Sequence, residues 1–116
     1  MKANHLIFSL IQLSVVLLFT ACNKEDTKDD PYPPFIVLNG ANPTWSPLGE
    51  PYEDAGAKAY DITATQDTID ISAKMQMESN INENVIGSYR VRYNVTDEAG
   101  NQAEEAVRVV YINIFK

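Results

Sequence analysis

Hydrophobic and polar positions alternate with a period of two in the second half of the chain. In SYRVRYNVTD, residues 88–97, one face carries Tyr89, Val91, Tyr93 and Val95, and the other carries Arg90, Arg92, Asn94 and Thr96. Strict alternation of this kind is typical of an antiparallel strand that buries one face. DEAGN then predicts a turn, and residues 102–115 return as the second strand of a hairpin. The phase of the alternation changes in that second strand, which predicts a bulge near Glu104–Glu105.

Three earlier segments also have strand patterns. PFIVLNG, residues 34–40, is a short apolar run that ends in an Asn-Gly turn. ANPTWSPLGEP, residues 41–51, contains three prolines and is therefore an edge strand or a loop. DTIDISAKMQM, residues 67–77, alternates throughout, as a single strand would. Together these segments predict an all-β antiparallel sandwich of about six or seven strands. We expect its core to contain Ile36, Leu38, Ile69, Ile71, Tyr89, Val91, Tyr93, Val95 and Val110.

The beginning of the chain has a different character. A positively charged start leads into an uncharged apolar run from Leu6 to Phe19. The run is shorter than the about 20 residues that cross a membrane, and it fits the hydrophobic middle of a secretory signal. Small residues then lead directly to Cys22, the single cysteine. This stretch resembles a bacterial lipobox, in which signal peptidase II cleaves before a cysteine that carries a diacylglyceryl group.

We therefore predict a lipoprotein signal peptide at residues 1–21, with fatty acyl chains (palmitate among them) on Cys22. The alternative is an ordinary secretory signal beside an incidental cysteine. Residues 22–33 are charged and lack apolar periodicity, so they predict a flexible acidic tether to a folded domain at residues 34–116. Within the tether, Lys24-Glu25-Asp26 resembles the export signal of Bacteroidota surface lipoproteins, although the run can also be a simple spacer. The expected location is the outer membrane, lipid-anchored and surface-exposed.

Composition then excludes several classes of function. All 16 acidic residues but only 8 of the 9 basic residues follow residue 21, which gives that part a net charge of −8 (8 − 16). Such a charge argues against nucleic acid and against docking on anionic lipid heads, so the expected membrane contact is the lipid alone. Removal of the signal also removes the only histidine, His5. Ser-His-Asp, Cys-His and His/Cys zinc sites are then excluded within one chain. We expect no enzyme activity and no cofactor.

Two blocks of the sequence resemble a known family. They are GEPYEDAGAKAYD at residues 49–61 and GSYRVRYNVTDEAGN at residues 87–101, preceded by PPFIVLNG and followed by RVV. In this order they resemble the immunoglobulin-like (Ig-like) domains of bacterial surface proteins, which are common in Bacteroidota lipoproteins and related to hyalin-repeat modules. The resemblance implies an Ig-like sandwich that serves as a spacer or as an adhesion and binding module. One departure is ITATQDT after Asp61, where the family usually has an acidic-Gly-Asp turn.

Several side chains are candidates for binding or modification. Asp54, Asp61, Asp97 and Asn101 offer oxygen ligands that a sandwich could gather around calcium at one pole. Because Asp and Asn also form turns through their own side chains, we favour the turn interpretation and expect no metal. Asp67-Thr68-Ile69 resembles the Bacteroidota O-glycosylation motif, which makes Thr68 a candidate modification site.

Exposed aromatic side chains could form a platform for a glycan. The candidates are Trp45, Tyr52 and Tyr60, with Tyr32 in the tether. Alternatively, Trp45 covers an open end of the core. The sequence thus predicts a non-catalytic interaction or accessory module that meets a protein partner within an outer-membrane assembly. The alternative is a carbohydrate-binding lipoprotein of a glycan-uptake system.

Overall fold

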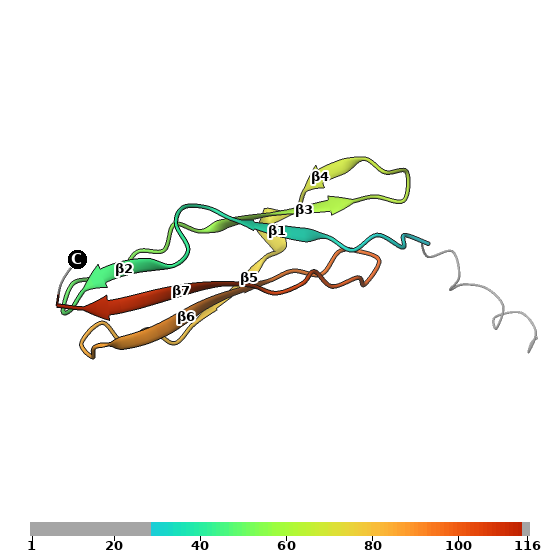
Figure 1. The fold of residues 1–116 in the computed structure, drawn as a ribbon. Coiled ribbons are helices and arrows are strands. Elements are labelled where there is room, and N and C mark those ends of the chain that lie inside the picture. Colours follow the sequence, from blue (N-terminus) through green and yellow to red (C-terminus); the bar gives the residue numbers. More distant parts are fainter. Residues whose placement is uncertain (1–28, 115–116) are drawn as a thin grey trace, which may run out of the picture.

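The computed structural model describes residues 29–114, which form an all-β sandwich (Figure 1). Predictions on the signal peptide, on Cys22 and on the tether up to residue 28 lie outside the described residues. The elements are β1 Phe35–Leu38, β2 Thr44–Pro47, β3 Ala57–Ile62, β4 Thr68–Asp70, the 3₁₀ turn η1 Ser72–Lys74, β5 Gln76–Ser79, β6 Gly87–Asn94 and β7 Ala106–Asn113. Within the described part, no helix has the length and apolar character needed to cross a membrane.

Two sheets form the layers of the sandwich. One contains three strands in the order β1-β3-β4, and the other contains four in the order β2-β7-β6-β5. β6 and β7 pair antiparallel, with Tyr89 opposite Val110 and Tyr93 opposite Ala106, which confirms the predicted hairpin. β2 pairs parallel to β7 at the edge of the larger sheet. Proline, which lacks a backbone N–H, is tolerated on an edge strand, and this accounts for Pro47 in β2.

The predicted bulge also lies where the phase change requires it. Tyr93 pairs with Ala106, and beyond it Thr96 forms an isolated bridge with Gln102. Residues 94–95 therefore face residues 103–105, so that two residues oppose three. This extra residue restores the alternation in β7, whose positions 108, 110 and 112 then point into the core.

The segment at residues 67–77 corrects the sequence analysis, because it is not one strand. β4 belongs to the three-stranded sheet, η1 crosses the gap, and β5 joins the four-stranded sheet beside β6. Ile71, directly before the crossing, is buried, whereas Ile69 is 47% exposed. The prediction of Ile69 as core was wrong. Ile69 lies opposite the buried Asp61 in the pairing of β3 with β4. Both residues line an open cavity of about 410 Å³, so the Ile69 side chain is not covered.

The core consists of two adjoining clusters. Val91, Tyr93, Val110 and Ile112 form the larger cluster, and Ala59, Ile71 and Val95 form the smaller one. Of the other predicted core residues, Ile36, Leu38 and Tyr89 are partly buried against these clusters. Ala59 lies in β3, a strand that the alternation did not predict.

The two ends of the sandwich differ in what they contain. β2 and β7 finish at one end of the long axis, and the segment that leads into β1, described from residue 29 on, lies at the other (Figure 1). The β3–β4 hairpin and the connection between β6 and β7 lie at the end near residue 29, here called the tether end. The opposite end is called the distal end. The candidate sites described below are located by these two ends.

Candidate metal centre and binding surfaces

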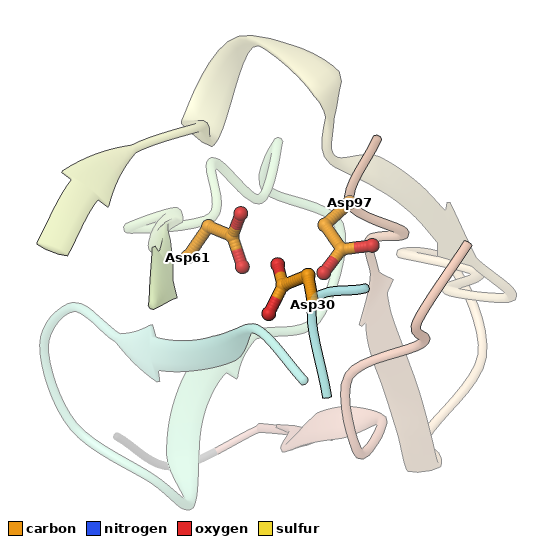
Figure 2. Close-up of side chains that lie close together, drawn as sticks. All are labelled: Asp30, Asp61 and Asp97. Atoms are coloured by element: carbon orange, nitrogen blue, oxygen red, sulfur yellow. The ribbon is translucent and has the colours of Figure 1, made fainter. Parts of the chain in front are cut away.

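Three carboxylates from separate parts of the chain converge at the tether end. Asp30 precedes β1, Asp61 lies in β3, and Asp97 begins the turn after β6. One carboxylate oxygen from each lies within 4.8 Å of the others. Figure 2 shows the three side chains pointing toward a common point. The described residues contain no other group of three or more His, Cys, Asp or Glu side chains with this proximity.

Asp97 has hydrogen-bond donors from its own turn. Its Oδ1 accepts from the backbone N–H of Asn101 at 2.7 Å, and its Oδ2 accepts from the Asn101 side chain at 3.0 Å. Gly100 provides the positive φ of +97° that the turn requires. Burial by itself raises the pKa of Asp97, but hydrogen bonds, first those from the Asn101 side chain and backbone and then one from the Ala99 backbone, bring this pKa below its usual value. Asp97 is therefore held ionised.

Asp61 has the opposite environment. It exposes only 7% of its surface, and its Oδ1 has no hydrogen-bond partner among the described residues. Burial, followed by the nearby charges of Asp97 and Asp30, raises the pKa of Asp61. A buried carboxylate without a partner is destabilising, because desolvation is not offset by any contact.

Asp30 connects the predicted tether to this turn. The Asn101 side-chain amide donates to the backbone oxygens of Asp30 at 2.8 Å and Tyr32 at 3.3 Å. Asp30 Oδ1 accepts from the Tyr32 backbone N–H at 2.9 Å, and the Tyr32 hydroxyl accepts from Gln66 at 3.0 Å. Sequence reasoning missed Asp30, because nothing in a run of tether acids indicates which one folds back onto the domain.

Asp54 lies apart from this cluster, in a buried polar network. Its Oδ2 accepts from Arg108 Nη1 at 2.6 Å, and Arg108 is 1% exposed. The hydroxyls of Tyr52, at 2.6 Å, and of Tyr93 also donate to Asp54, as does the Gly56 N–H at 2.8 Å. Burial opposes ionisation of Asp54, but these donors lower its pKa. Of the four candidate oxygen ligands, the structure thus brings together Asp61, Asp97 and Asn101, adds Asp30 and separates Asp54.

The same network keeps the two tyrosines protonated. Burial and the Asp54 carboxylate raise the pKa of Tyr93 to about 12, and they raise the pKa of Tyr52 as well. Arg108 also donates to the backbone oxygens of Ala41 and Asn39. A cation at an inward position of β7 is therefore satisfied by a carboxylate and main-chain acceptors.

The predicted aromatic platform does not assemble. Trp45 is 55% exposed on the outer face of the larger sheet, and its ring centroid lies 4.6 Å from that of Tyr111 in β7. Tyr52 belongs to the Asp54 network, whereas Tyr60 packs against Phe35 at 5.5 Å in the other sheet. The aromatic pair on this outer face is thus the exposed Trp45 with the half-buried Tyr111, which sequence reasoning missed. The parallel pairing of β2 with β7 places them side by side, and no local pattern indicates that pairing.

Thr68, the candidate modification site, begins β4 at the edge of the smaller sheet and is exposed. Its glycosylation stays a prediction. Four exposed apolar side chains occur at the distal end and are named here the distal apolar end: Leu48, Val85, Ile86 and Ile114. The Leu48 N–H donates to the Asn113 oxygen at 2.8 Å, and Gly87 pairs with Ile112, which brings the flanking residues together.

Comparison with known proteins agrees with this architecture. Residues 36–112 match the family described as "Bacterial surface protein, Ig-like domain". The chain belongs to this family of bacterial cell-surface Ig-like domains, which is a typically non-catalytic class. Among solved structures, it is similar to the lipoprotein BT2262 from Bacteroides thetaiotaomicron, with a TM-score of 0.56 and 20% identity. That match covers 72% of this chain and 39% of the BT2262 chain, and it shows the fold alone. No curated protein matches the chain.

Proposed function

We propose that the protein is a non-catalytic, lipid-anchored surface protein of the outer membrane, and that its Ig-like domain is an interaction or accessory module. The surface family and the likeness in fold to a Bacteroides lipoprotein support this proposal. The lipobox-like sequence before Cys22 supplies the anchor. After residue 21 the chain contains no histidine and no cysteine other than Cys22, which supports a role without histidine- or cysteine-dependent catalysis.

The observation that carries the proposal is the distal apolar end. Val85 and Ile86 directly precede β6, Ile114 directly follows β7, and these three side chains are 51, 54 and 60% exposed. An anchor that precedes residue 29 would present this end away from the membrane. Clustered exposed apolar side chains are typical of protein contact sites, because their burial against a partner is favourable. We therefore propose a protein partner of the outer membrane that covers this end.

Cross-linking on intact cells, followed by capture of this protein, tests the proposal. We expect a defined partner with the wild-type chain and a loss of at least tenfold with the double variant Ile86→Ser, Ile114→Ser. Ile69→Ser is the matched control, since Ile69 is 47% exposed but lies near the tether end. Equal capture by both variants would contradict a distal contact.

A second candidate function rests on the pair of Trp45 and Tyr111. Two adjacent, tilted aromatic rings on an exposed sheet face can stack against a sugar ring. If the protein serves glycan uptake, wild-type protein is retained on an immobilised polysaccharide and Trp45→Ala is not, while both melt alike. Retention of the Trp45→Ala variant on the polysaccharide would exclude this platform. Loss of retention in Ile86→Ser would indicate that the glycan binds at the distal end instead.

A further inference from the structure

The buried carboxyl group of Asp61 has an oxygen atom without a partner in the described part of the chain. Asp61 Oδ1 has neither solvent contact nor a hydrogen-bond partner there, and the side chain points toward Asp30 and Asp97 (Figure 2). Native proteins rarely leave a buried polar atom unpaired, and a bound ion is one established reason for such an atom. The neighbouring Asp97 carboxyl group is fixed in place by two hydrogen bonds from Asn101, so its orientation toward Asp61 is preset.

Within residues 29–114, no cationic side chain forms an ion pair with these carboxyl groups. The ion pairs of the described residues are Lys74–Glu98, Arg92–Glu105 and Arg108–Asp54, and none involves the three converging carboxylates. Lys74 is the one cationic side chain that lines the cavity of about 410 Å³ beside Asp61. Its Nζ lies 3.7 Å from Glu98 Oε2, in a pair that is largely exposed. Among the described residues, three carboxyl groups thus converge without a paired cation.

The ligand chemistry indicates which ion fits. All three groups are carboxylates, and hard oxygen ligands of this kind suit Ca²⁺. Ca²⁺ binds oxygens at about 2.3–2.6 Å, so two ligands on opposite sides of one ion are up to about 5 Å apart. The oxygens of Asp30, Asp61 and Asp97 lie within 4.8 Å of one another and meet this limit. We propose that these three carboxylates bind Ca²⁺, with water and main-chain oxygens completing its coordination.

Binding there would join the tether to the domain. Asp30 lies in the segment that leads to the predicted anchor, whereas Asp61 and Asp97 belong to the sandwich. Without the ion, the segment is fixed by hydrogen bonds from Asn101 and Gln66. With the ion, the Asp30 carboxylate gains two fixed partners, and the segment at residues 29–33 stiffens. This inference is independent of what the distal end binds.

Thermal melting of the full chain in detergent tests the site. Extracellular modules bind Ca²⁺ with Kd of about 10⁻⁴–10⁻³ M. At a concentration about ten times Kd, we expect the melting temperature to rise by about 5 °C over protein in chelator. Mg²⁺ at the same concentration should give a clearly smaller rise. No rise with Ca²⁺, or an equal rise with Mg²⁺, would overturn the assignment.

Single substitutions test whether the Ca²⁺-dependent rise in melting temperature comes from the three carboxyl groups. Asp61→Asn replaces a buried carboxyl group that has an unpartnered oxygen, so this variant should fold and melt at least as high as wild type in chelator, yet show no Ca²⁺ response. Asp30→Asn should lose most of the response. Asp29→Asn is the control, because Asp29 is an exposed neighbour outside the cluster, and it should respond fully. A response that survives Asp61→Asn would place the ion elsewhere and overturn the proposal.

Hydrogen exchange gives a readout of the tether itself. We expect Ca²⁺ to slow exchange of the amide hydrogens of Asp29, residue 30 and Tyr32 at least threefold in wild type and not in Asp30→Asn. If Ca²⁺ raises the melting temperature without slowing exchange in this segment, the three-carboxylate site that includes Asp30 is wrong.

Discussion

At the scale of single residues, the side chains with the largest consequences are charged and buried. Arg108 and Asp54 illustrate this, since each satisfies the other inside the sandwich. Removing one partner of a buried pair costs about 3–5 kcal/mol, because the remaining charge is left without compensation. The sequence does show Arg108 at an inward position of an alternating strand. It does not show which of 16 acidic residues is its partner.

The pair predicts a specific acid dependence of stability. The folded-state pKa of Asp54 is lowered, so Asp54 stabilises the fold above the unfolded pKa of about 3.9. That stabilisation is lost as the pH falls through the lower folded-state pKa. Asp54→Asn should therefore lower the free energy of unfolding by about 3 kcal/mol at neutral pH.

Urea unfolding of both proteins over a pH series measures this effect. The difference in free energy of unfolding between wild type and Asp54→Asn should shrink at acidic pH, where wild type loses the stabilisation from ionised Asp54. A difference that stays constant down to about pH 2 would show that Asp54 does not act through its charge.

At the scale of elements, the alternation identified strands more reliably than it identified their ends. The β6–β7 hairpin and its bulge followed from local pattern, because the alternation of one strand and the phase change of the other specify register. The segment at residues 67–77 has equally regular alternation, yet the chain leaves one sheet after Ile71 and enters the other at Gln76. Local periodicity does not record which sheet supplies the hydrogen-bond partners.

Two isoleucines on either side of Asp70 test this crossing. Ile71→Ala should lower the free energy of unfolding by about 2–5 kcal/mol, because Ile71 is 9% exposed within the smaller core cluster. Ile69→Ala should lower it by less than about 1 kcal/mol, since Ile69 faces the open cavity. Chemical denaturation measures both losses of unfolding free energy. Equal losses would indicate the continuous half-buried strand that alternation alone predicts.

At the scale of the whole molecule, the sandwich has unlike ends. Carboxylates and the incoming tether meet at one end, and apolar side chains are exposed at the other. This arrangement suits a protein that is held at one end and makes contact at the other. The lipid anchor that would hold it depends on Cys22, which lies outside the described residues.

The anchor has its own test. Cys22→Ser should transfer the protein from the membrane fraction to the soluble extracytoplasmic fraction and abolish labelling by radioactive palmitate. The physical reason is that stable attachment needs more than one acyl chain, and this cysteine is where they would be added. Asn23→Gln is the control and should leave both properties unchanged. Membrane retention of Cys22→Ser would indicate an attachment that does not depend on lipid.

The sequence by itself determined the fold class, the hairpin with its bulge, the family and the absence of histidine-based chemistry after residue 21. Period-two alternation, composition and the Gly-x-Tyr to Asp-x-Ala-Gly-Asn block are local properties that can be found along the chain. Only the tertiary structure decided that Asp30 meets Asp61 and Asp97, that Asp54 pairs with Arg108 and that Trp45 lies beside Tyr111. Each of these contacts joins residues that are more than 30 positions apart, and strand pairing and the return of the tether bring them together.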